Sequence, residues 1–115
     1  MIFVAKDIAT KIVVKEEREV ATRPIMALLD LLGRRWALRL LWEVHERGAL
    51  GFAELQAHST GISPSVLSQR LKELVAAGLL VVDDDGRYGP GRDAEQLAQI
   101  LLDLDAWAKR WKRRS

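Results

Sequence analysis

Apolar residues recur with helical spacing from residue 22 onwards. Ile25, Leu28, Leu29 and Leu32 follow the i, i+3, i+4, i+7 pattern of one helical face. Pro24 suits the first turn of this helix, because a missing N–H costs nothing there. Gly33 is placed to end it. We therefore expect a first helix that starts at Pro24.

Two more helices are predicted before residue 60. One covers Arg34–Arg47 and ends at Gly48, and its inward positions are Trp36, Ala37, Leu40, Leu41 and Val44. The other is short, covers Phe52–His58, and is anchored by Phe52 and Leu55.

A tight turn and a fourth helix follow. Gly61 permits the turn, and Ile62 can fill the core. Ser63 can cap the next helix and Pro64 can open it. The helix is predicted to run from Pro64 to about Ala77. One of its faces is apolar, at Leu67, Leu71, Leu74 and Val75, and the opposite face is small or polar, at Ser65, Gln69, Lys72 and Ala76, with Ser68 beside it.

The rest of the chain predicts a hairpin and a long final helix. Leu79–Val82 is a strand pattern, Asp85-Gly86 is a hairpin turn signal, and Arg87-Tyr88 begins a very short return strand. Gly89-Pro90-Gly91 is the link to a helix over about Asp93–Arg113. This order of elements is that of a winged helix-turn-helix, a mainly α fold with a small β-hairpin.

The final helix carries a heptad pattern. Its apolar positions recur at alternating spacings of three and four residues, at Leu97, Ile100, Leu104, Trp107 and Trp111, with Leu101 and Ala108 beside them. This pattern favours a homodimer through a C-terminal dimerisation helix, since large aromatic residues are enriched at interfaces. The alternative is that these residues pack internally against Ile25–Leu32.

Composition narrows the class of protein. A chain of 115 residues fits one small domain, here 22–115, preceded by an N-terminal arm at 1–21 whose structure the pattern leaves ambiguous. The absence of cysteine excludes disulfides, thiolate zinc sites, iron–sulfur clusters and thiol-based redox sensing. No apolar run approaches the roughly 20 residues of a transmembrane helix, and no signal peptide is evident. We expect a cytoplasmic protein without membrane contact.

The net charge of +2 hides an uneven distribution. Residues 83–106 carry seven acidic and two basic side chains, whereas residues 107–115 carry five basic and no acidic ones. A basic helix end complements the helix dipole, so the tail by itself is weak support for nucleic-acid binding. The three aspartates Asp83–Asp85 at the hairpin tip would repel phosphates, which leaves Arg87 as the one plausible contact of the wing.

Signals for catalysis are missing. His45 and His58, the only histidines, have no neighbour at metal-ligand spacing, and no nucleophile motif, phosphate loop or dinucleotide fingerprint occurs. We expect no enzyme activity, no cofactor and no metal. No site for a small-molecule effector can be assigned.

Several motifs resemble those of HxlR-type transcriptional regulators, in the MarR-like superfamily. They are Leu-Leu-Gly-Arg-Arg-Trp at 31–36, Phe-Ala-Glu-Leu at 52–55, Gly-Ile-Ser at 61–63, Val-Leu-Ser-Gln-Arg-Leu-Lys-Glu-Leu at 66–74 and Ala-Ala-Gly-Leu-Leu at 76–80. The resemblance implies a homodimer on palindromic operator DNA, with the helix at about 64–77 in the major groove. Many members carry a cysteine just before the proline of the first helix, some as an oxidant sensor; here that residue is Arg23. Family wings are also usually longer and more basic.

The leading hypothesis is a dimeric, sequence-specific DNA-binding regulator. The candidate base-reading residues are Gln69, Lys72, Ser65 and Ser68, and the candidates for backbone contacts are Ser63, Arg35, Arg70 and Arg87. Arg70 has the alternative of an intramolecular salt bridge. The competing hypothesis is a winged-helix module for protein–protein contact, favoured by the acidic stretch and the short wing.

Overall fold

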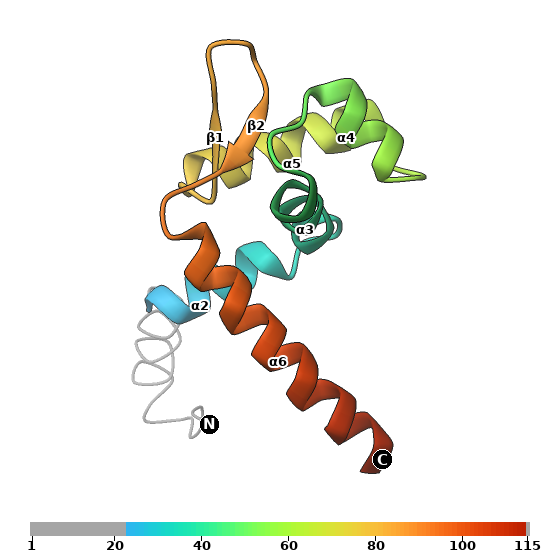
Figure 1. Ribbon diagram of the computed structural model, residues 1–115, viewed down its shortest axis with the longest axis vertical. Coiled ribbons are helices and arrows are strands. Elements are labelled where there is room, and N and C mark those ends of the chain that lie inside the picture. The colour runs from blue at the N-terminus through green and yellow to red at the C-terminus, as the bar shows by residue number, and fades with distance from the viewer. Residues whose placement is uncertain (1–22, 115) are drawn as a thin grey trace, which may run out of the picture. The chain divides into compact units, whose positions relative to one another are not determined.

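The computed structural model describes residues 23–114 (Figure 1). The chain divides into two compact units, of which the second begins at Arg35. The first unit contributes one described helix, α2 (Pro24–Leu32), which has Pro24 in its first turn. The Gly33 N–H closes α2 with a hydrogen bond to the Leu29 carbonyl. These are the predicted start and end. The predicted arm at 1–21 lies outside the described residues.

The second unit contains the remaining elements. They are α3 (Ala37–Arg47), α4 (Phe52–His58), α5 (Pro64–Ala76), β1 (Leu80–Val82), β2 (Tyr88–Pro90) and α6 (Ala94–Arg114). In this unit the hairpin and α4 lie towards one end, and the C-terminal end of α6 lies at the other (Figure 1). The order and the antiparallel two-stranded hairpin confirm the predicted winged helix-turn-helix.

The core of this unit is built mainly from leucines at helical spacing. The buried apolar side chains are Ala37, Leu40, Val44, Leu50, Leu55, Ile62, Leu67, Leu71, Leu74, Leu80 and Ala98. Each element from α3 to α6 therefore contributes at least one buried side chain except β2, and Ile62 fills the core from the turn, as predicted. Burying one leucine side chain stabilises the fold by about 1.5–3 kcal/mol.

The predicted start of the second helix was wrong. Arg34–Trp36 were expected to be helical, but α3 begins at Ala37 and Trp36 adopts a left-handed conformation with φ +79°. A non-glycine residue seldom adopts this conformation. Trp36 is held there by neighbours distant in sequence: the Arg35 carbonyl accepts a hydrogen bond from Arg70, and the indole of Trp36 lies against Gly61. Periodicity within one segment carries no information about such contacts.

The hairpin is shifted from its predicted bounds: β1 begins at Leu80 and not at Leu79, and β2 begins at Tyr88 and not at Arg87. Gly89 and Pro90 were assigned to a link, but both belong to β2, where Pro90 is opposite Leu80 and Gly89 is opposite Val81. Leu50 extends the pairing, since it exchanges two backbone hydrogen bonds with Tyr88, of 2.9 and 2.7 Å. The link therefore begins at Gly91. A Cβ at Gly91 would collide with the carbonyl oxygen of Gly78, so glycine is required there.

Among the helices of residues 23–114, none is long and apolar enough to cross a membrane.

Candidate nucleic-acid interface

The helix α5 is fixed at its start and along one face. The Ser63 hydroxyl accepts a hydrogen bond of 3.2 Å from the Val66 N–H, and Pro64 occupies the first turn. Gly61 precedes this cap with φ +98°, a conformation that favours glycine. Leu67, Leu71 and Leu74 are buried beneath the helix. The cap and the buried face were predicted, and both are confirmed.

The opposite face of α5 is open to solvent. Ser65, Gln69, Lys72 and Ala76 are exposed, and Ser68 is partly buried. We call this set the polar face of α5. The Gln69 amide donates a 2.9 Å hydrogen bond to Glu73, and the hydroxyls of Ser65 and Ser63 lie 3.4 Å apart. No ion pair of Lys72 is found within residues 23–114. The DNA major groove is wide enough to admit an α-helix, and short polar side chains of this kind can approach base edges there.

Arg70 is engaged inside the protein. Its Nε donates a 2.9 Å hydrogen bond to the Arg35 carbonyl, and its NH1 donates to Glu73 at 3.4 Å. The side chain is only 20% exposed. The intramolecular alternative foreseen for this residue is therefore the one observed. The guanidinium of Arg35 stays exposed, above the ring of Trp36 at 5.5 Å from the ring centroid.

The wing is a compact acidic turn. The Asp83 carboxylate accepts hydrogen bonds from the backbone N–H groups of Asp85 and Arg87, both of 2.9 Å. The Arg87 side chain folds back to the Ala49 carbonyl at 3.0 Å and to Glu54 at 3.4 Å. Asp83 therefore shapes the turn. The guanidinium of Arg87 would have to exchange these partners before it could bind a phosphate.

A cluster of charged side chains on α3 is bonded to His58, the last residue of α4. Glu43 accepts hydrogen bonds from Arg47 at 2.7 Å and from Arg39 at 3.1 Å, and Arg39 also donates to the His58 carbonyl at 2.8 Å. The bond from Arg47 lowers the pKa of Glu43 most, burial opposes this effect, and Arg39 adds to the lowering. These side chains brace α3 against the end of α4.

The predicted dimer residues fall into two groups. Ile100, Leu104, Trp107 and Trp111 are exposed on α6, whereas Leu97 and Leu101 are partly buried. The rings of Trp107 and Trp111 are stacked, with centroids 6.3 Å apart. The first group places four large, exposed apolar side chains on one helix. A cluster of exposed apolar side chains often marks an interaction site.

No group of three or more metal-ligating side chains occurs in the described part of the chain. His45 packs instead against Trp42, with ring centroids 5.3 Å apart.

Sequence reasoning placed Trp36 inward but missed its contact with the turn, and it missed the role of Leu50 altogether. Trp36 supports the turn through Gly61, and Leu50 anchors the hairpin through Tyr88. The Gly-x-x-Trp motif at 33–36 was the one sequence signal for Trp36. It marks the residue as part of a family motif, but it does not predict which residues the indole contacts.

Comparison with known proteins decides the family. Residues 31–115 match the family model of the HxlR-like helix-turn-helix. The chain belongs to the HxlR-like family. An HTH-type transcriptional regulator of Bacillus subtilis, YvaP, is 30% identical over 89 residues, which are 72% of this chain and 82% of YvaP.

Solved structures agree in fold with this HxlR-like protein. The quinone-bound form of YodB from Bacillus subtilis is 26% identical with a TM-score of 0.70, over 77% of this chain and 99% of that one. A protein of Thermoplasma volcanium, described as a possible HxlR family transcriptional factor, is 23% identical with a TM-score of 0.62, over 79% of this chain and 86% of that one. The family model and the similarity to YvaP together show that the chain is a transcriptional regulator of the HxlR-like family.

Proposed function

We propose that this HxlR-like regulator binds a palindromic DNA operator as a homodimer, with α5 in the major groove. The observation that carries the proposal is the contrast between the two faces of α5. Leucines bury one face, while Ser65, Gln69 and Lys72 are exposed on the other. A helix anchored in this way can enter a groove without disturbing its own packing.

The exposed side chains suit direct recognition of base edges. The Gln69 amide can pair with the N6 and N7 atoms of adenine, and Lys72 can reach guanine or a phosphate. Gln69 would exchange its present partner, Glu73, for the base. The exposed hydroxyls of Ser63 and Ser65 stand at the N-terminus of α5, where the helix dipole favours a phosphate. Arg35 is a further candidate for a backbone contact.

The role of the wing is small in this proposal. Its tip carries Asp83, Asp84 and Asp85, and Arg87 is already bonded to Ala49 and Glu54. Phosphate repulsion at the tip leaves α5 as the main source of affinity and specificity. Membership of a regulator family favours this function over a module for protein–protein contact. We also propose a cytoplasmic location.

The experiment is selection of bound sequences from a random duplex pool. The proposal predicts enrichment of an inverted repeat whose half-sites are about one helical turn apart, because two α5 helices related by a two-fold axis would read them. Enrichment of a single half-site would contradict the homodimer but keep DNA reading. Binding without any enrichment, or no binding at low salt, would overturn the proposal.

A further inference from the structure

A set of exposed apolar residues of α6 has the same spacing when it is counted from either end of the helix. It consists of Ile100, Leu104, Trp107 and Trp111, whose side chains are between 49% and 56% exposed. We call it the apolar face of α6. Its spacings are four, three and four residues. This sequence of spacings is its own mirror image about a point between Asp105 and Ala106.

This symmetry specifies how a second copy fits. If two α6 helices pack antiparallel about that point, Leu104 lies opposite the partner's Trp107, and Ile100 lies opposite the partner's Trp111. Every layer then joins one tryptophan to one aliphatic side chain. A parallel pair in register would instead place each tryptophan against its own copy. Alternation of large and smaller residues across a seam favours close packing.

Charges beside the apolar face point to the same alignment. Asp103 precedes Leu104 and Arg110 precedes Trp111, so both flank the same edge, one heptad apart. In an antiparallel pair such positions face each other, and flanking charges select the orientation of paired helices. Asp103 would therefore meet the partner's Arg110, and Arg110 the partner's Asp103.

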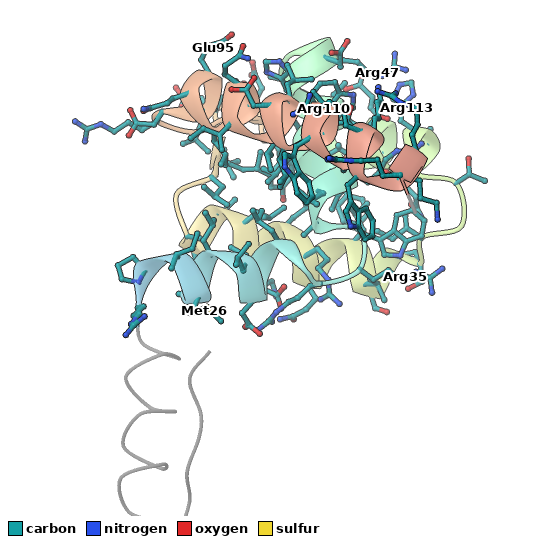
Figure 2. The ribbon with its side chains drawn as sticks, turned by 90° about the horizontal axis from the view of Figure 1, so that it is seen from below. Met26, Arg35, Arg47, Glu95, Arg110 and Arg113 are labelled. Carbon is teal, nitrogen blue, oxygen red and sulfur yellow. The ribbon has the colours of Figure 1, made fainter. Side chains whose placement is uncertain are left out.

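The parallel alignment lacks this complementarity. It would bring the basic ends of both helices together, each with Lys109, Arg110, Lys112, Arg113 and Arg114. Arg110 and Arg113 lie in this C-terminal part of α6, and Glu95 lies near its other end (Figure 2). Like charges at short distance are destabilising. The antiparallel alignment separates the two basic ends.

We propose that the apolar face of α6 binds the same face of a second copy of the chain, antiparallel, with two reciprocal Asp103–Arg110 ion pairs. This inference rests on the homodimer of the proposed function and specifies its interface. In the single chain, Asp103 accepts one hydrogen bond, of 3.1 Å, from Gln99 on its own helix. That bond to Oδ1 leaves Oδ2 available to the partner.

Charge reversal tests the alignment. Asp103→Arg alone and Arg110→Asp alone each replace two attractions by two repulsions, and each is expected to weaken dimerisation about tenfold in sedimentation equilibrium. The double variant Asp103→Arg/Arg110→Asp restores both pairs and is expected to dimerise nearly as well as the unmodified chain. Lys112→Asp is the matched control, because Lys112 is two positions from Arg110 and the two side chains do not face each other on the helix. Circular dichroism checks that every variant folds.

A distance measurement gives a second test. Because the chain has no cysteine, a single Arg114→Cys variant takes one spin label per copy. The antiparallel alignment separates the two labels by about 25 Å along the helix axis, at 1.5 Å per residue. A parallel alignment places them side by side.

The outcomes separate this inference from the proposed function. Rescue by the double variant together with the long label distance supports the antiparallel pair. A dimer that shows no rescue, or the short distance, overturns the alignment and leaves operator binding intact. A chain that stays monomeric at high concentration overturns the inference and the homodimer together. The same holds if the apolar face of α6 binds a different protein and the chain does not dimerise. Operator selection then reports separately whether α5 reads DNA.

Discussion

The Nε of Arg70 lies 2.9 Å from the carbonyl oxygen of Arg35 and donates a hydrogen bond to it. Arg70 is in the middle of α5, whereas Arg35 is the first residue of the second unit. Trp36, next to Arg35, lies against Gly61 in the turn that leads into α5. The Arg35–Trp36 segment therefore contacts both α5 and the turn that precedes it.

The first prediction concerns this bond. Arg70→Met should lower the free energy of unfolding by about 1.5–3 kcal/mol, since it removes a hydrogen bond from a charged donor. Arg70→Lys should lose less, because lysine keeps a charge beside Glu73. Urea unfolding measures both. In contrast, a loss of DNA affinity at unchanged stability, with a salt slope reduced by about one, would make Arg70 a phosphate contact.

The second prediction concerns a buried hydroxyl. Ser59 is fully buried at the end of α4, and its hydroxyl has no hydrogen-bond partner among the described residues. Because an unsatisfied buried polar group is costly, Ser59→Ala should raise the free energy of unfolding by up to about 1 kcal/mol. Thermal and urea unfolding measure the change.

Ser63→Ala is the matched control for this substitution. It also removes one hydroxyl, but that hydroxyl caps α5 through the Val66 N–H. Its loss should destabilise the protein by about 1 kcal/mol. Opposite signs for the two variants are expected. Destabilisation by Ser59→Ala of the same size as that by Ser63→Ala would show that the buried hydroxyl has a stabilising partner.

The third prediction concerns pH. Hydrogen bonds from Arg47 and Arg39 hold the pKa of Glu43 below its usual value in the folded protein. A lowered folded pKa contributes stability above the unfolded pKa, and this stability is lost as the pH falls through the folded pKa. Glu43→Gln should therefore cost about 0.5–1 kcal/mol at neutral pH, from two i,i+4 pairs, and nothing at strongly acidic pH.

Urea unfolding of the Glu43→Gln variant and the unmodified chain, from pH 7 down to pH 2, measures this difference. Glu46→Gln is the control, since Glu46 is an exposed carboxylate on the same helix. A stability difference for Glu43→Gln that is independent of pH would show that the ionised carboxylate is not the stabilising species.

Much of the fold could be predicted because its signals are local. Pro24, Ser63 and Pro64 mark helix starts, and leucine periodicity marks the buried face of α5. The same periodicity in α2 buries only Leu32, while Ile25 and Leu29 are exposed. The start of α3 could not be predicted, because the left-handed conformation of Trp36 depends on contacts with Arg70 and Gly61. These residues are 34 and 25 positions further along the chain. The full extent of β2 depends likewise on pairing with Leu80 and Leu50.

The candidate site shows the same division. Helical periodicity was enough to predict which α5 side chains are exposed, since it follows from backbone geometry alone. Helical periodicity could not predict the hydrogen-bond partners of Gln69, Arg70 and Arg87. A long polar side chain can reach several acceptors, and only the folded chain determines which of them lie near. Roles in DNA binding stay predictions for every residue named.

The most direct test of the central claim is the affinity of a Gln69→Ala/Lys72→Ala variant for the selected operator and for a scrambled duplex. Lys109→Ala is the control of matched charge, since Lys109 is exposed on α6 and paired with Asp105. We predict that the double variant loses the difference between the two duplexes while its unfolding is unchanged, and that the control keeps the difference. A double variant that still prefers the operator as strongly as the unmodified chain would contradict DNA reading by α5.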